Sequence, residues 1–245
     1  MKKSIIFIIL MITGNLGALT LNNFGFFSQM MYHEQADIVL YRTVVSPGFS
    51  FIYTNEHRNG KISFFNEVSS TSSVTPFVFR NRKLVDETPN MSFEHTSEYS
   101  LRIYLPERFR FRYITGFGAG VIMKTDIFPA GINLYFTILR VIPHVFLSQG
   151  LSIQPVKRCN IVITNSSGGG YGIMQQFNEL KYTANQPVYM VNNSLNISCN
   201  YKLTRSLSIE AGYRNDFRVV LAVGDFIPDV FFNNSIRVGV VYALY

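Results

Sequence analysis

The most constraining feature of this sequence is a two-residue period in which apolar and polar side chains alternate. Between residues 191 and 203 one parity is apolar except at Asn193, and the other parity is wholly polar. Successive side chains of a β-strand point to opposite faces, so this segment predicts a strand with one apolar and one polar face. Residues 207–216 repeat the pattern after the short link Thr204-Arg205-Ser206, which predicts a hairpin.

The same alternation recurs along the chain and predicts an all-β protein. The predicted strands are 38–45, 49–57, 61–68, 74–80, 99–105, 109–121, 132–145, 152–164, 191–203, 207–216 and 235–245. Short turns are predicted near 58–60, 106–108, 147–151 and 204–206, and longer links at 81–92, 124–131, 165–190 and 217–234. Asn59-Gly60 is a type I′ hairpin signal, and 165–170 and 225–234 have loop chemistry.

Residues 1–20 are predicted to be a cleavable signal peptide, leaving one domain at 21–245. A basic start, Met1-Lys2-Lys3-Ser4, precedes the apolar run Ile5 to Ile12, and small residues follow. A membrane-spanning helix needs about 20 apolar residues, so this run is too short for one. The alternative is an uncleaved anchor.

Composition and strand length together favour a membrane barrel. Charged residues make up 15% of the chain and aromatic residues another 15%, whereas soluble domains carry about 25% charged residues. The predicted strands approach the roughly ten residues that a tilted transmembrane strand needs. In lipid only a closed sheet satisfies every backbone group. We therefore expect an antiparallel up-and-down transmembrane β-barrel in the outer membrane, with ten strands favoured and eight the alternative. A soluble sandwich, which also alternates, is the competing fold.

The C-terminal segment resembles a known assembly signal. Arg237, Gly239, Tyr242 and Leu244 match the polar residue, the glycine and the two hydrophobic positions of the β-signal of outer-membrane barrels. The resemblance implies recognition by the barrel assembly machinery. Segments 99–105 and 204–217 are also similar to small barrels common in Bacteroidetes, including the PorT-like group.

The polar faces of the predicted strands carry charges that we expect to point into the lumen. They are Arg102, Arg110, Arg112, Lys202, Glu210, Arg214, Asp216 and Arg237. They fit either an anion-favouring pore or a packed interior in which acids and bases pair to offset burial. The packed interior is favoured, because side chains just fill a small barrel.

Catalytic motifs are weak throughout. His95-Thr96-Ser97 places an imidazole and a hydroxyl on one strand face, the spacing found in outer-membrane phospholipases and lipid A deacylases. Its parity with Phe93 and Leu101 points that face away from the lumen. The histidines have no metal spacing. Gly116, Gly118 and Gly120 form no dinucleotide fingerprint and are expected to admit bulky side chains from across the lumen. We expect no enzyme activity, no metal and no cofactor.

Two cysteines and the net charge bear on partners. Cys159 and Cys199 either form one disulfide in an oxidising compartment or remain two small apolar residues. Removing Lys2 and Lys3 lowers the formal charge from +7 to +5 (7 − 2), and no Lys/Arg run suggests nucleic acid. The expected contacts are outer-membrane lipid, the barrel assembly machinery and possible envelope proteins. We expect an envelope scaffold or a protein that acts through its loops; a small porin-like transport pore and a lipid-modifying hydrolase are the alternatives.

Overall fold

The computed structural model describes residues 19–36, 41–75, 77–80, 83–85, 90–105, 110–131, 134–178, 181–223 and 229–244. None of these residues belongs to a helix of the length and apolarity that crossing a membrane requires. They form strands, which are β1 (Leu19–Ala36), β2 (Tyr41–Asn59), β3 (Ile62–Thr75), β4 (Phe77–Arg80), β5 (Lys83–Val85), β6 (Asn90–Tyr104), β7 (Phe111–Gly131), β8 (Leu134–Val156), β9 (Cys159–Asn178), β10 (Lys181–Lys202), β11 (Leu207–Ala222) and β12 (Asp229–Leu244).

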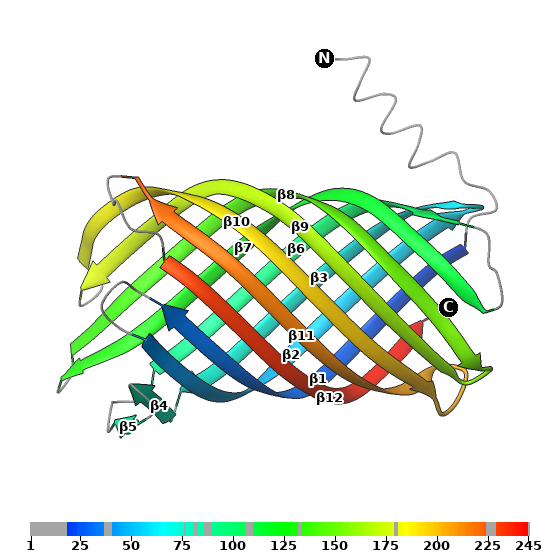
Figure 1. Cartoon of the computed structure of the whole chain (residues 1–245), viewed down its shortest axis with the longest axis horizontal. Coiled ribbons are helices and arrows are strands. Elements are labelled where there is room, and N and C mark those ends of the chain that lie inside the picture. Colours follow the sequence, from blue (N-terminus) through cyan, green and yellow to red (C-terminus); the bar gives the residue numbers. More distant parts are fainter. Residues whose placement is uncertain are drawn as a thin grey trace, which may run out of the picture.

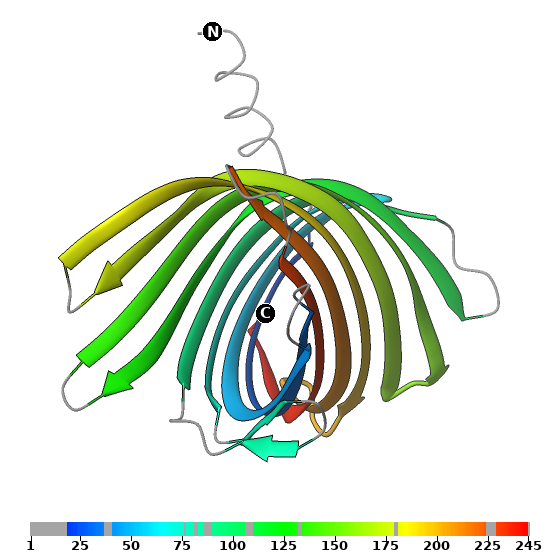
Figure 2. The same ribbon diagram turned by 60° about the vertical axis from the view of Figure 1, so that its left-hand side comes forward.

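The sheet closes on itself through its first strand. β1 pairs antiparallel with β12 on one side and with β2 on the other, so that Phe24 lies opposite both Tyr242 and Tyr53. Around the ring the order is β1-β12-β11-β10-β9-β8-β7-β6-β3-β2, and the short β4–β5 hairpin continues from the start of β2 (Figures 1 and 2). This confirms the ten-stranded antiparallel up-and-down barrel and rules out the two-sheet sandwich.

One end of the barrel carries both the start of β1 and the end of β12 together with tight turns. We call it the tight-turn end. Two residues, Gly60 and Lys61, join β2 to β3, and two more join β8 to β9. The hairpin at Asn59-Gly60 is confirmed. Of its two loop residues, Gly60 and Lys61, Gly60 has a positive φ (60°) and Lys61 does not. A type I′ turn needs positive φ at both loop residues, so the turn is of the II′ kind.

Several strands are longer than predicted. β8 runs unbroken through the expected turn at 147–151, where Ser148 pairs with Gly116 and Ser166. β9 and β10 likewise occupy most of the expected link 165–190. The Gly-rich run at 165–170 is therefore strand, because pairing on both sides overrides its local loop preference. β1 was not predicted as a strand. It begins at Leu19, inside the segment 1–20 that was predicted to be the signal peptide.

The predicted signal peptide lies outside the described residues except for Leu19 and Thr20. These two residues are the first of β1 and pair with Arg58 and His57. The strand thus begins two residues before the expected start of the barrel domain at residue 21.

Parity decides which side chains enter the barrel. On β11 the even positions are buried or half-buried and point inward, and the odd positions are mostly more exposed. The inward glycines of β7 leave room for neighbours on the paired strand rather than for side chains from across the lumen. A Cβ at Gly118 would lie 2.5 Å from Cζ of Phe146, and one at Gly120 would lie 2.9 Å from Cε1 of His144, both on β8. The sequence interpretation of these glycines was wrong in that respect.

Candidate functional site

An ion pair crosses the barrel from wall to wall. The guanidinium of Arg218 on β11 donates from Nη1 and Nη2 to the two carboxylate oxygens of Glu94 on β6, at 2.9 and 2.8 Å. In the ring order β6 is five strands from β11 in either direction, so the two residues come from opposite walls. A bidentate Arg–carboxylate pair is among the strongest polar contacts available to side chains. We call this pair the cross-barrel strut.

Further ion pairs surround the strut. Asp216 lies 2.9 Å from Nε of Arg214 and 3.6 Å from Nη2 of Arg218. Nearer the tight-turn end, Arg237 contacts Glu210 at 3.0 Å. The lumen at this level is therefore filled by paired acids and bases. A small void of about 70 Å³ lies among them.

An apolar layer lies on the other side of the strut, away from the tight-turn end. It consists of inward side chains that pack against one another: Ile122, Ile142, Val188, Met190, Val220 and Ala222, with Met174 and Phe231 beside them. The void between this layer and Arg218, Lys124 and Arg140 measures about 30 Å³. A void this size has room for a water molecule or two and excludes larger solutes.

A further hollow inside the barrel opens at the tight-turn end. This vestibule has a volume of about 470 Å³. Phe27, Glu67, Arg102, Glu210 and Arg237 are among the residues that line it. The strut lies farther from the tight-turn end, because Glu94 and Arg218 are farther from it along β6 and β11 than Arg102 and Glu210 are. The strut therefore lies between the vestibule and the opposite end of the barrel.

The predicted lumenal charges divide into two groups. Arg102, Arg112, Glu210, Arg214, Asp216 and Arg237 lie inside the barrel wall and are half-buried or buried. Arg110 and Lys202 lie at the rim and are exposed. Arg110 follows the end of β6 by several residues and its Nη1 donates to the carbonyl of Pro155, so it belongs to the turn region rather than to the lumen.

The sequence interpretation included Glu210 and Asp216 but missed three other lumenal acids. Glu67, Glu94 and Glu98 all point inward, and Glu67 and Glu98 face each other on β3 and β6. Glu98 also lies 3.2 Å from Nε2 of the buried His144. The even-numbered parity of 94–104 could have revealed Glu94 and Glu98. Arg218 was hidden because it fell in an expected loop at 217–234.

The four residues that resemble the β-signal lie on the faces that strand parity predicts. Tyr242 and Leu244 face outward with 49% and 46% of their surfaces exposed. Arg237 points inward and stacks over the Phe27 ring at 4.9 Å. Gly239 also faces inward, and its backbone lies so close to Phe27 that a side chain there would clash.

The structure gives His95 a hydrogen-bond partner other than Ser97 of the His95-Thr96-Ser97 motif. His95 faces outward and its Nδ1 lies 2.9 Å from Oγ of Ser70 on β3. The two residues line an outward hollow of about 480 Å³ beside Phe49, Phe51 and Phe93. Among the described residues no carboxylate lies within ion-pair distance of His95, and no group of His, Cys, Asp and Glu could hold a metal ion.

The outer wall of the barrel is largely apolar. Tyr189 and Tyr201 on β10 both face outward, at 53% and 45% exposure, and are 12 residues apart (201 − 189). At about 3.3 Å per residue and a 45° tilt, they stand about 28 Å apart along the barrel axis. That separation matches the hydrocarbon thickness of a bilayer. Asn193, which interrupts the apolar face between them, donates to Oγ of Ser167 at 2.6 Å.

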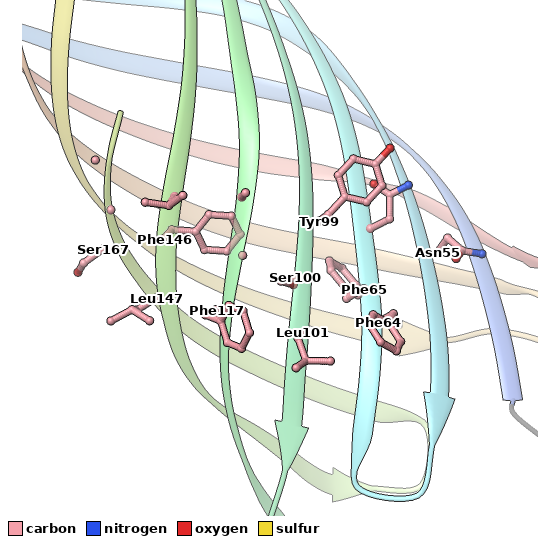
Figure 3. Close-up of a pocket in the computed structure, with 16 residues that line it drawn as sticks. Asn55, Phe64, Phe65, Tyr99, Ser100, Leu101, Phe117, Phe146, Leu147 and Ser167 are labelled. Carbon is pink, nitrogen blue, oxygen red and sulfur yellow. The ribbon is translucent and has the colours of Figure 1, made fainter. Parts of the chain in front are cut away.

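A broad apolar hollow indents this outer wall. It measures about 1210 Å³ and spreads over neighbouring strands from β3 to β9. Figure 3 shows Phe64, Leu101, Phe117 and Leu147 around it. Gly169, which has no side chain, and Ala119 also line it. Apolar surface of this kind is stable against lipid tails and unfavourable against water.

Solved structures share this architecture. The outer membrane protease OmpT from Escherichia coli superposes with a TM-score of 0.56 at 8% identity, covering 94% of this chain and 99% of that one. The chain has the fold of an outer-membrane β-barrel. The translocator domain of the autotransporter NalP from Neisseria meningitidis aligns over 98% of this chain and 95% of that one, at 10% identity and a TM-score of 0.45. No family model matches the barrel sequence, and neither does any curated protein.

Proposed function

We propose that this chain is a non-enzymatic outer-membrane protein with an occluded lumen, which acts as an envelope scaffold or through the parts it exposes beyond the membrane. The cross-barrel strut is the observation that carries the proposal. Glu94 and Arg218 join opposite walls, and small voids of about 70 and 30 Å³ flank their contact. A lumen bridged in this way supports a packed barrel rather than a transport pore.

The strand lengths support a role outside the bilayer. A tilted transmembrane strand needs about 9–11 residues, whereas β8 has 23 and β10 has 22. Pairing of β7 with β6 ends at Ile127 and pairing of β10 with β11 ends at Val188, yet β7–β8 and β9–β10 continue. These four strands therefore extend past the rest of the wall, at the end opposite the tight turns (Figure 1). Outer-membrane barrels place short turns on the periplasmic side, so this four-stranded extension would face outward from the cell.

The absence of catalysis is part of the same proposal. His95 and Ser70 form a hydrogen-bonded pair but have no third group that would orient and charge the imidazole among the described residues. Nucleophilic hydroxyls normally need such a base–orienter arrangement.

Conductance in planar lipid bilayers tests the occluded lumen. We expect no steady conductance from wild-type protein whose folding has been verified by a change in gel migration on boiling. Large, stable channels would contradict the proposal and favour the pore. Anion selectivity that disappears in Arg112→Ala would then assign the pore to the lumenal arginines.

A further inference from the structure

We propose that the vestibule at the tight-turn end is a binding site for a short saccharide that carries a carboxylate. The inference rests on the proposed function in one respect: if the lumen is occluded, a ligand in the vestibule stays bound there and does not pass through the barrel. Its volume of about 470 Å³ falls in the range of about 300–1,000 Å³ that small-molecule sites occupy.

The two sides of the vestibule differ in chemistry. The wall formed by β9, β10 and β11 is polar, with inward amides and hydroxyls at Asn160, Thr164, Asn196, Ser198, Asn200 and Ser208. The facing wall, from β1, β2, β3 and β12, is mixed: it carries the apolar side chains Leu21, Phe27, Ile52, Phe65, Val241 and Ala243, with Asn23, Thr54, Glu67 and Arg237 among them. A pyranose ring has the same division, because its hydroxyls project from the rim and its C–H groups form the faces.

The polar wall offers both hydrogen-bond donors and acceptors. Oδ1 of Asn160 accepts from Ser152 at 2.9 Å, which leaves its Nδ2 as a donor. Nδ2 of Asn200, directly opposite Asn160, donates to Ser208 at 3.0 Å, which leaves its Oδ1 as an acceptor. Oδ1 of Asn196 is shielded from solvent and has no hydrogen-bond partner among the described residues. Sugar hydroxyls donate and accept, so they suit this mixed array.

The charge of the vestibule favours an acidic ligand at its mouth. Lys202 is exposed at the rim and forms no ion pair with the described residues. Arg102 lies deeper, with its guanidinium carbon 3.3 Å from the centre of the Phe65 ring, and it too has no carboxylate within ion-pair distance in the described ranges. Glu210 is occupied by Arg237. The carboxylate of the ligand would therefore lie toward Lys202, with the sugar ring against Phe65.

Calorimetry on the full chain in detergent micelles tests the site. The probes are cellobiouronic acid and cellobiose, which differ by one carboxylate. We expect saturable heat from both, with the acid bound about fivefold more tightly, as an exposed charge pair allows. Lys202→Ala should remove this preference, so that the two probes bind with similar affinity. Arg158→Ala is the matched control, because Arg158 is an exposed cation at the same end outside the vestibule, and it should change nothing.

The amide wall supplies a second test. Asn196→Ala together with Asn200→Ala should weaken both probes at least tenfold in protein that still shifts on boiling. Undiminished binding in this variant would overturn the site, and so would the absence of heat from folded wild-type protein. Conductance is measured separately. A barrel that binds but conducts refutes only the occluded lumen, and a sealed barrel that binds neither probe refutes only the saccharide site.

Discussion

Removing one side of the cross-barrel strut should destabilise the barrel far more than removing both. In Arg218→Met, Glu94 keeps its charge at a site with 22% side-chain exposure, and Asp216 loses a cation 3.6 Å away. Breaking a buried pair by removing one partner costs about 3–5 kcal/mol. Glu94 retains some solvent access, and the cation Lys124 lines the same small cavity. We therefore expect Arg218→Met to lower the free energy of unfolding by about 3 kcal/mol, the lower end of this range.

The matched double variant Glu94→Gln/Arg218→Met removes both charges and keeps similar volumes. We expect it to lie within about 1 kcal/mol of wild type, because apolar or neutral replacements of buried ion pairs are often neutral. With about 3 kcal/mol for Arg218→Met and a double variant within about 1 kcal/mol of wild type, the coupling free energy in the double-mutant cycle should be at least about 2 kcal/mol (3 − 1), and larger by whatever Glu94→Gln costs alone. The chain contains no Trp, so urea unfolding in detergent is best followed by the heat-sensitive gel shift. If the two single effects add, with a coupling free energy below about 0.5 kcal/mol, then the contact between Glu94 and Arg218 does not stabilise the barrel and the reasoning is refuted.

Three further predictions follow from side-chain placement. Val240 faces outward with 49% of its surface exposed, whereas Val241 lines the vestibule. Val240→Arg should therefore cost up to about 2–4 kcal/mol in the membrane, and the folded fraction by gel shift should fall far more than for Val241→Arg; equal losses would mean that both faces are buried. The sulfurs of Cys159 and Cys199 lie 3.7 Å apart, so oxidation by a disulfide catalyst should yield an intramolecular bridge with the loss of two hydrogens by mass spectrometry, and two thiols that both remain alkylatable would contradict this. Purified protein should not hydrolyse phospholipid or lipid A, and turnover that is lost in Ser70→Ala or Ser97→Ala would overturn the non-enzymatic assignment.

The sequence by itself determined the type of fold and the orientation of most strands. The alternation at 191–203 and 207–216 reports which residues share a face, because strand side chains repeat every two residues. The same rule placed Val240 outside and Arg237 inside. The barrel class followed because a closed sheet is the arrangement that lets such strands cross lipid.

Strand ends and long-range partners were decided by the tertiary structure. Local turn chemistry at 147–151 and 165–170 pointed to loops, but ladders on both sides hold these residues in β8 and β9. Such pairing is not visible in a local window, because its hydrogen bonds come from distant segments.

The candidate sites show the same division. Parity can place Glu94 and Arg218 in the lumen, yet their contact joins residues 124 positions apart on opposite walls. His95 contacts Ser70 rather than Ser97 because β3 and β6 pair in that register. The periodicity of the sequence determined which face each side chain occupies, whereas the register and closure of the barrel decided which side chains meet, since those depend on how all ten strands fit together.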